Sequence, residues 1–391
     1  MFSHRLPWDA PKNKLSQVLA SKRAQHAPLL DLTESNPTRV GLEYPEAEIL
    51  SALADPRALV YEPDPRGLRA AREAIAAGYS HRGQLVDPNH VLLTASTSEA
   101  YAFLFKLLCE PGDAVLVPTP SYPLFEFLAD LDGVRLTRFP LAYDGTWHID
   151  LAGLEEALAR ESRARAILIV NPNNPTGSFL KRDEQMRLCA LAAAHDLTLV
   201  SDEVFADYPV SDAPAPDRII SVALLDAPCL CVSLGGLSKG AGLPQLKLGW
   251  MVVGGSKPLR DVALDRLEII ADTYLSVSSP VALAAPRLFE LGAVVRQRIQ
   301  SRIRENRAWL SSQLEKDSPI QLLPAEGGWY AILRLPNTLT DEELALRLLS
   351  DHSVLAHPGY FFDLPIPTCL VISLLCAPDV FQRGALAILR G

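Results

Sequence analysis

The stretch GLSKGAGLPQLKLGW, residues 236–250, is the part of the sequence that says most about the fold. It joins a glycine-rich turn to one lysine, Lys239, and then to a second, Lys247, before an apolar run begins. The segment just before it, CLCVSLG, has the composition of a buried strand. A lysine in a turn is usually a solvated surface charge. Its place directly after a strand of this kind therefore needs an explanation.

Around this stretch, from about residue 66 to 285, apolar runs alternate with helical patterns. The strand-like runs include HVLLTAS, DAVLVPTP, ARAILIV, LTLVSDEV and LKLGWMVVG, and helix-like segments such as SEAYAFLFKLLCE stand between several of them. Near-continuous apolar strands separated by helices predict a mostly parallel sheet covered by helices on both faces. The sequence thus indicates an α/β fold whose large domain spans residues 45–285.

A second, smaller α/β domain is predicted from both chain ends. A long helical pattern follows Pro280 and leads into further strands, including GGWYAILRL and CLVISLL, with helices between them. We assign residues 286–391 to this small domain. The first segment, 1–44, has no strong periodicity, and we expect it to join the same domain.

Composition limits the kinds of partner. The chain has 391 residues, 48% of them hydrophobic, and a formal net charge of -9, so it can bury a large core but does not suit nucleic acid or an anionic membrane. No apolar run approaches the roughly 20 residues that span a bilayer, and the N-terminus lacks a signal-peptide pattern, so we expect a cytoplasmic protein. The six cysteines form no CxxC pair and the eight histidines no HExxH motif. We expect free thiols and no metal site.

Polar residues fall at the predicted carboxyl ends of several strands, where open parallel sheets bind ligands. In TASTSEA, the small residues Ser96, Thr97 and Ser98 open a helix, which is either an anion site or an ordinary helix cap. The turn NPNNPTG offers the Asn174 amide, or is only a turn. In SDEVFADY, Asp202 and Glu203 are acids at a buried strand end, which is costly unless a cation meets them, and a solvated strand end is the alternative for Glu203.

Together, and in this order, these motifs resemble the class I/II aminotransferase family of fold-type-I pyridoxal-phosphate enzymes. The resemblance runs from ESNPT to LVISLL, which is nearly the whole chain. It implies that Lys239 is the Schiff-base lysine, holding the aldehyde of pyridoxal 5'-phosphate as an imine and moving a proton. It also implies that Asp202 pairs with the pyridine nitrogen, so that the ring acts as an electron sink.

The same resemblance assigns the remaining cofactor contacts. Asn174 would hydrogen-bond the phenolic oxygen of the ring, and Tyr122 would stack on the ring face. Ser96, Thr97, Ser98 and Lys247 would hold the phosphate. Tyr61 matches a family tyrosine that reaches the phosphate of the neighbouring subunit, which implies a homodimer with sites at the interface.

Four positions depart from the family pattern. Lys247 replaces the usual phosphate-binding arginine, a point charge in place of a bidentate fork. Phe205 replaces a tyrosine that donates to the phenolic oxygen, and Gly236 stands where a serine often touches the phosphate. The fourth departure bears on the substrate: Val371 occupies the place of the arginine that binds the substrate α-carboxylate. The candidate replacements are Arg39 first, then Arg66 and Arg334.

The leading hypothesis is an aminotransferase that moves an amino group from an amino acid to an oxo acid or related carbonyl. The alternative is other pyridoxal-phosphate chemistry on the same fold, such as a β-lyase, decarboxylase or synthase, which the missing arginine favours. A non-catalytic binding protein is a third interpretation, against which the joint presence of Lys239, Asp202 and Asn174 argues. The sequence names neither the amino donor nor the acceptor.

Overall fold

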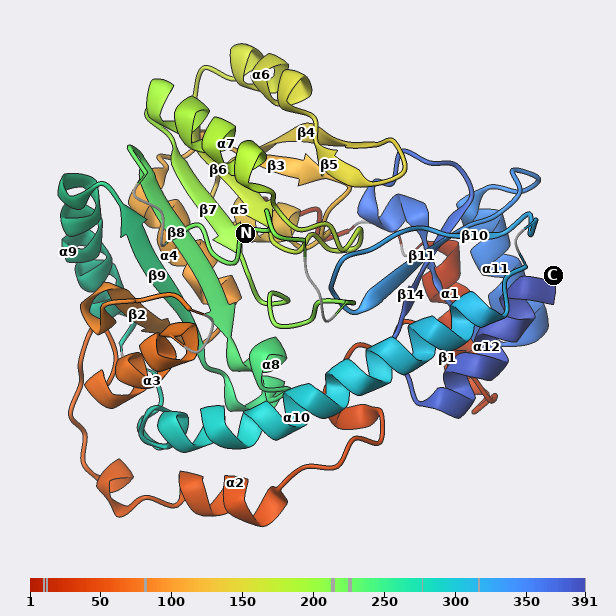
Figure 1. Cartoon of the computed structure of the whole chain (residues 1–391), viewed down its shortest axis with the longest axis horizontal. Helices are drawn as coiled ribbons and strands as arrows, with labels where there is room; N and C mark the ends of the chain where they lie inside the picture. Colours follow the sequence, from red (N-terminus) through yellow and green to blue (C-terminus); the bar gives the residue numbers. More distant parts are fainter. Residues whose placement is uncertain are drawn as a thin grey trace.

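The computed structural model describes residues 1–9, 11, 13–80, 83–211, 215–223, 227–275, 277–315 and 317–390. Its centre is a sheet of eight strands, shown in Figure 1. In spatial order these are β2 (Val91–Thr94), β9 (Gly249–Gly255), β8 (Leu230–Gly236), β7 (Thr198–Asp202), β6 (Ala164–Val170), β3 (Ala114–Thr119), β4 (Arg135–Tyr143) and β5 (Trp147–Ile149). Strands β8 to β4 are mutually parallel, and β2, β9 and β5 provide the antiparallel pairings.

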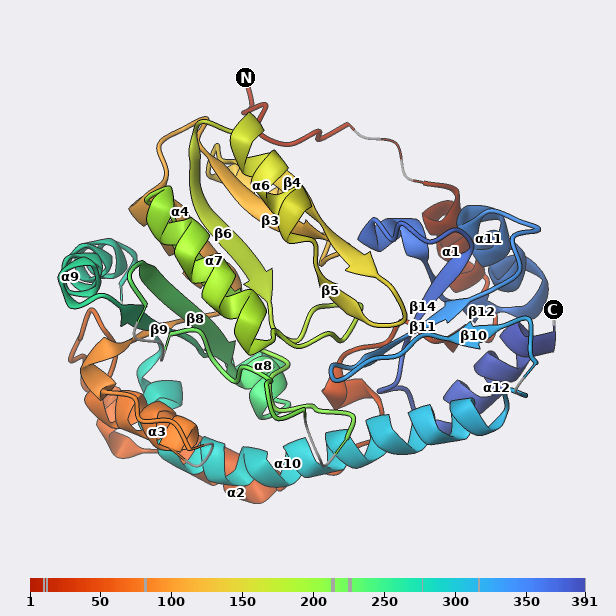
Figure 2. The same cartoon turned by 45° about the horizontal axis from the view of Figure 1, so that its top comes forward.

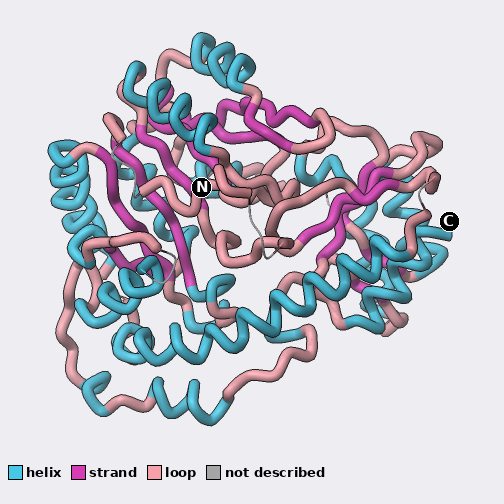
Figure 3. The backbone as a smooth tube through the Cα atoms, in the orientation of Figure 1, coloured by secondary structure: helices cyan, strands magenta, loops and turns pink. Residues whose placement is uncertain are grey.

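Helices cover both faces of this sheet (Figure 3), which confirms the predicted α/β class. They are α3 (Arg69–Ser80), α4 (Thr97–Leu108), α5 (Phe125–Leu131), α6 (Leu151–Arg160), α7 (Arg182–Ala194) and α9 (Lys257–Tyr274). Alternate strand residues face opposite sides, because successive side chains of a strand do so. Leu116 packs in one apolar cluster with Leu154 of α6, while Val115 packs in the other with Leu104 of α4.

The small domain contains residues from both chain ends, as predicted. Its antiparallel sheet has the order β10 (Gln321–Leu322), β11 (Tyr330–Arg334), β14 (Cys369–Ser373) and β13 (His357–Pro358). From the N-terminal segment, β1 (Leu30–Asp31) pairs in parallel with β12 (Val354–Leu355). The helices here are α1 (Lys14–Ala24), α11 (Asp341–His352) and α12 (Pro378–Arg390).

One long helix, α10 (Ser279–Ser312), extends from beneath the large sheet to the small domain (Figure 2). It contacts α3 and α2 (Glu46–Leu53) on one side and α12 on the other. It is continuous through residue 285, so the boundary at 285/286 remains a prediction. The remaining described elements are the short helix α8 (Leu237–Gly240) and five 3-10 helices: η1 (Pro37–Arg39), η2 (Pro56–Leu59), η3 (Pro88–His90), η4 (Pro244–Leu246) and η5 (Gly359–Phe362). Among the described helices, none is long and apolar enough to cross a membrane.

All six cysteines are unpaired, and five of them are buried. Three of these, Cys189, Cys229 and Cys231, come together in the apolar layer beneath α7, with their sulfur atoms within 4.8 Å of one another. The sequence spacing gave no sign of this cluster, because it depends on how α7 packs on the sheet.

Candidate active site

A cavity of about 370 Å³ opens at the carboxyl ends of β6, β7 and β8, between the two domains. Its floor comes from the large sheet, and Ser35 and Tyr330 contribute a wall from the small domain. Eight of the nine predicted site residues line this one cavity: Ser96, Thr97, Ser98, Tyr122, Asn174, Asp202, Lys239 and Lys247. Residues more than a hundred positions apart in the sequence therefore meet where parallel sheets bind ligands.

Lys239 lies on α8 (Leu237–Gly240), a single helical turn that begins directly after β8 ends at Gly236. Its amine lies over two aromatic rings, 4.8 Å from the ring centre of Trp329 and 5.8 Å from that of Phe205. Burial lowers the pKa of Lys239 from its usual 10.5 to about 8, although the charge of Asp202 opposes this shift. A large fraction of this amine is therefore uncharged near pH 8, as a nucleophile and proton carrier requires.

Asp202 is the last residue of β7 and is only 8% exposed. Its Oδ2 accepts a hydrogen bond from the Tyr101 hydroxyl at 2.8 Å, and its Oδ1 accepts from the Val204 amide at 3.1 Å. Burial raises the pKa of Asp202, while these two hydrogen bonds and the charge of Lys239 act to lower it. A bound cation would restore the preference for the ionised carboxylate.

The role of Tyr101 was missed in the sequence analysis. The residue sits on the apolar face of α4, and its sequence neighbours are typical of an ordinary core helix. Only the packing of α4 against the sheet brings its hydroxyl to Asp202, where burial and the nearby carboxylate raise the pKa of Tyr101 well above its usual value. Tyr101 therefore remains a hydrogen-bond donor and positions the carboxylate.

Glu203, the neighbour of Asp202, also differs from expectation. We considered a solvated strand end for this side chain, and that interpretation is wrong. Glu203 is 7% exposed, and its Oε1 accepts hydrogen bonds from the Ser233 hydroxyl at 2.7 Å and the Val222 amide at 3.0 Å. It is a structural acid that holds two segments together.

Asn174 projects from the turn that follows β6. Asn173 fixes this turn through Thr176, whose hydroxyl donates to Asn173 Oδ1 at 2.9 Å. At Gly177, φ is +71° and a side-chain Cβ would lie 2.4 Å from the carbonyl oxygen of Gly327, so only glycine fits. Asn174 itself is 6% exposed, and its Oδ1 has no hydrogen-bond partner within the described part of the chain. A buried, unpaired amide of this kind favours a ligand contact.

The N-terminus of α4 forms the anion end of the cavity. Ser96 is the helix cap, with its hydroxyl oxygen accepting from the Glu99 amide at 3.2 Å. Thr97 and Ser98 are the first two helical residues, whose backbone N–H groups have no partner within a helix. The two interpretations from sequence, a cap and an anion site, are thus compatible, because the cap leaves these N–H groups available.

Of two glycines near the α4 terminus, Gly249 on β9 allows a close approach and Gly236 at the end of β8 is not needed for one. A Cβ at Gly249 would lie 2.8 Å from the Ser96 carbonyl carbon and 3.0 Å from the Thr97 nitrogen. A Cβ at Gly236 would have no neighbouring atom closer than 3.4 Å, and Thr97 Cγ2 would lie 3.8 Å away. The serine that the family often has here would therefore fit at position 236. Steric crowding does not require a glycine at this position.

Lys247 lines the same end of the cavity and is exposed. Its backbone is left-handed, with φ of 53° and ψ of 58°, directly after η4. Such a conformation costs a non-glycine residue about 1 kcal/mol or more. No hydrogen bond or ion pair to Lys247 is found among the residues described, so its charge is available to an anion.

Two aromatic residues flank the centre of the cavity. Tyr122 is 39% exposed and meets the edge of Phe125 at a ring separation of 6.0 Å. Phe205 packs edge-on against Trp329 at 5.3 Å and Tyr330 at 6.4 Å. Phe205 has no hydroxyl to donate, so the family hydrogen bond from this position is absent, and Phe205 serves as apolar lining.

Tyr61, the ninth predicted residue, lies outside this cavity. It is 70% exposed and lines a separate hollow of about 520 Å³ with Val60 and Val277. The structure of one chain thus does not bring Tyr61 to the other eight residues. Its expected partner site belongs to a neighbouring subunit and stays a prediction.

The arginine candidates for carboxylate binding do not line the cavity either. Val371 is fully buried on β14, opposite Ile332 of β11. Arg66 bonds Glu268 at 2.6 Å and is a structural pair. Arg39 and Arg334 are exposed and are not among the residues that line the cavity.

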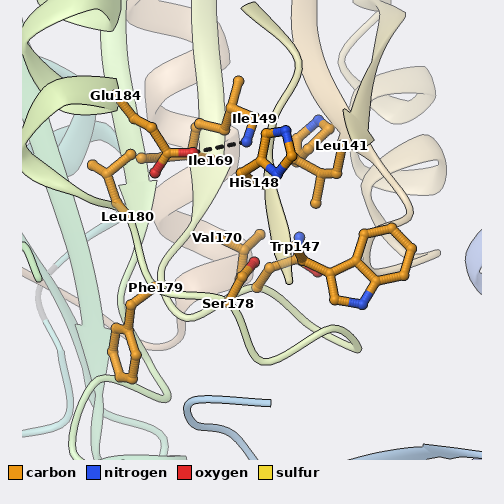
Figure 4. Close-up of a pocket in the computed structure, with 12 residues that line it drawn as sticks. Leu141, Trp147, His148, Ile149, Ile169, Val170, Ser178, Phe179, Leu180 and Glu184 are labelled. Atoms are coloured by element: carbon orange, nitrogen blue, oxygen red, sulfur yellow. Dashed lines mark hydrogen bonds between the residues drawn. The ribbon is translucent and has the colours of Figure 1, made fainter. Parts of the chain in front are cut away.

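A second hollow, beside the end of β6, is too small to be an active site. Figure 4 shows its lining residues, in which Glu184 accepts a hydrogen bond from the Ile149 amide at 2.8 Å. Its volume of about 20 Å³ is close to that of one water molecule. The 370 Å³ cavity is the candidate active site because Lys239, Asp202 and Asn174 meet there, and not because of its size.

A lysine with a lowered pKa, a buried carboxylate and a helix N-terminus that meet in one cavity are consistent with a fold-type-I pyridoxal-phosphate enzyme. The family model for class I and II aminotransferases matches residues 27–387, so the chain belongs to that family. The family uses pyridoxal phosphate and transfers amino groups between amino acids and oxo acids, and this chain is an aminotransferase.

Individual relatives agree with this assignment. The chain is 28% identical to an alanine aminotransferase of Mycobacterium tuberculosis, over 93% of this chain and 90% of the relative. It is also 28% identical to the glutamate-pyruvate aminotransferase AlaA of Escherichia coli, covering 87% and 84%. Among solved structures, an alanine aminotransferase from Pyrococcus furiosus shares the fold with a TM-score of 0.86, at 21% identity over 100% of this chain and 99% of that one.

Proposed function

We propose that this aminotransferase binds pyridoxal 5'-phosphate with Lys239 as its Schiff-base lysine, and that it moves the amino group between alanine or glutamate and a 2-oxo acid such as pyruvate. The observation that carries the proposal is the meeting of Lys239 and Asp202 in one largely buried cavity. The choice of substrates is drawn from the names of the relatives.

The residues of the cavity fit the cofactor group by group. The phosphate suits the free N–H groups of Thr97 and Ser98 with the charge of Lys247. The Nδ2 of Asn174 can donate to a ring oxygen, while its buried Oδ1 can accept from a donor on a bound ligand. The buried Asp202 suits a protonated ring nitrogen, since a carboxylate in a dry site prefers a cationic partner. Tyr122 offers an aromatic face to a planar ring.

The chain's own groups then supply the proton chemistry. When bound, pyridoxal phosphate carries the amino group between the two half-reactions and accepts electrons from the substrate. Lys239 is the base within the cavity, and its pKa of about 8 suits both taking and giving a proton near neutral pH. The rings of Trp329 and Phe205 lie beside this amine and contribute to its burial.

A homodimer is part of the same proposal. Apolar side chains are exposed near Tyr61, with Leu59 at 91% and Val60 at 58%. Leu275, close in sequence to the hollow that Tyr61 lines, is 67% exposed. A second copy of the chain would cover this surface and receive Tyr61 at its phosphate end. We also propose a cytoplasmic location, since six free thiols are typical of a reducing compartment.

The test is a half-reaction. Purified protein loaded with pyridoxal phosphate should show a visible absorbance band that borohydride removes, and alanine or glutamate should convert this band to that of pyridoxamine phosphate. Pyruvate should reverse the conversion. Release of ammonia and an oxo acid without an acceptor would instead indicate a lyase, and a band that no amino acid changes would refute the proposal.

A further inference from the structure

The cavity poses a charge problem for an amino acid substrate. Among the described residues that line it, the cations are Lys239 and Lys247. The proposed function uses the first for the cofactor aldehyde and the second for the phosphate. No guanidinium is left for the α-carboxylate, since position 371 holds a buried valine. A carboxylate without a partner in a dry site is strongly disfavoured, so other donors are required.

Tyr330 lies between Val371 and the cavity. In the register of β11 and β14, Tyr330 faces Ser373, and Ile332 faces Val371. These four residues share one face of the small sheet, because paired residues and residues two apart point the same way. Tyr330 lines the cavity while Val371 does not. Tyr330 thus occupies the cavity side of the valine, where a longer residue at 371 would have to extend.

The neighbouring loop places Ser35 at the same wall. The Ser373 amide donates to the Leu32 carbonyl at 2.7 Å, which ties the loop after β1 to β14 beside Tyr330. The Asn36 amide donates to Glu34 Oε1 at 2.8 Å and fixes the turn around Ser35. Ser35 also lines the cavity, and its hydroxyl lies near enough to the Tyr330 phenol to act on the pKa of Tyr330.

The Tyr330 ring is held rigidly, and its hydroxyl remains a donor. Its ring centre is 6.4 Å from that of Phe205 on one side and 6.4 Å from that of Phe362 on the other. Burial raises the pKa of Tyr330 above 10, although the Ser35 interaction acts in the opposite direction. The phenol is therefore protonated at physiological pH and can donate to an anion.

We propose that the hydroxyls of Tyr330 and Ser35 bind the substrate α-carboxylate in place of an arginine. The inference rests on the proposed function, because it assumes an amino acid in this cavity. The two neutral donors come from separate chain segments that β14 holds together. Each forms a hydrogen bond with a charged acceptor, the stronger class of hydrogen bond. The site therefore selects a carboxylate by hydroxyl geometry and not by a matching positive charge.

The experiment compares Tyr330→Phe and Ser35→Ala with the parent enzyme on two amino donors, alanine and ethylamine, which lacks the carboxylate. Tyr330→Phe keeps the ring and removes only the hydroxyl. For alanine we expect KM to rise about 10- to 100-fold in Tyr330→Phe, the worth of one hydrogen bond to a charged group, with kcat changed only a few-fold. KM for ethylamine should not change. Tyr143→Phe, which removes a hydroxyl outside the cavity, is the matched control.

A binding measurement without turnover gives a second readout. Calorimetric titration of the loaded enzyme with propionate, an unreactive carboxylate, should show a Kd weakened by a similar factor in Tyr330→Phe and unchanged in Tyr143→Phe. Equal losses for alanine and ethylamine, or unchanged propionate binding, would overturn the inference. A parent enzyme that transfers no amino group refutes the proposed function instead, while the propionate titration still tests the carboxylate site.

Discussion

The two walls of the cavity differ in how closely they follow the family. The large-domain wall carries Lys239, Asp202 and Asn174 at the ends of three neighbouring strands, as in the family pattern. The small-domain wall has lost the arginine and presents Tyr330 and Ser35. The difference teaches that the reaction is determined by the sheet, whose strand ends are fixed by a buried core. The substrate contacts that we propose come from a second domain, whose residues can change without disturbing that core.

The sharpest test of the large-domain wall is Lys239→Ala. We expect turnover to fall by at least about 10⁴-fold, because the variant loses both the amine nucleophile and the proton carrier. Steady-state transamination of alanine measures this. Lys257→Ala, which removes an exposed lysine on α9, should keep full activity as the control. Near-normal turnover in Lys239→Ala would mean that this wall does not carry the chemistry.

Asp202→Asn should have the next largest effect. The change preserves size and removes the negative charge that the ring nitrogen would meet, so turnover should fall about 100- to 1,000-fold, as when one preorganised electrostatic contact is lost. Cofactor should still bind, which an absorbance titration can verify. A loss of only a few-fold would indicate that the carboxylate has a structural role through Tyr101.

Val371→Arg tests the opposite wall. Val371 is fully buried among apolar neighbours, and Tyr330 stands between it and the cavity. An arginine there should reduce the free energy of unfolding by about 3 kcal/mol or more, as for an unpaired buried charge. Urea unfolding measures the loss, and Val371→Met separates size from charge. A stable variant with higher kcat/KM for alanine would show that the family arginine can still reach the substrate.

That the large-domain residues come together in one cavity could be predicted from the sequence, because each of them belongs to a short motif next to a strand. Lys239 follows an apolar strand by a few positions, and Asn174 sits in a turn rich in proline. Parallel strands bring such positions to one edge whatever the details of packing. The α/β class followed from the same alternation of strands and helices.

The sequence did not reveal contacts that depend on packing between distant segments. Tyr101 reaches Asp202 across 101 positions, through the placement of α4 on the sheet. Ser35 meets Tyr330 only because β14 holds the N-terminal loop. Arg39, the first candidate from sequence for the carboxylate, is exposed and away from the cavity. Side-chain direction across such contacts has no short-range signal in the chain.

The smallest predicted effect concerns how far the Lys239 amine, on the large-domain wall, is shielded from water. In cofactor-free protein, burial lowers the pKa of Lys239 from 10.5 to about 8. The folded chain therefore binds fewer protons than the unfolded chain between these values, and parent stability should rise with pH across this window. Lys239→Met lacks the buried charge. Its free energy of unfolding should exceed that of the parent by up to about 3 kcal/mol at every pH below 8. This difference should shrink as the pH rises toward 10.5. Urea unfolding at several pH values measures it, and repeating the pair in an Asp202→Asn background removes the coupled carboxylate. A margin that does not change with pH would mean that water reaches the lysine, and that this wall is no drier than the one facing it.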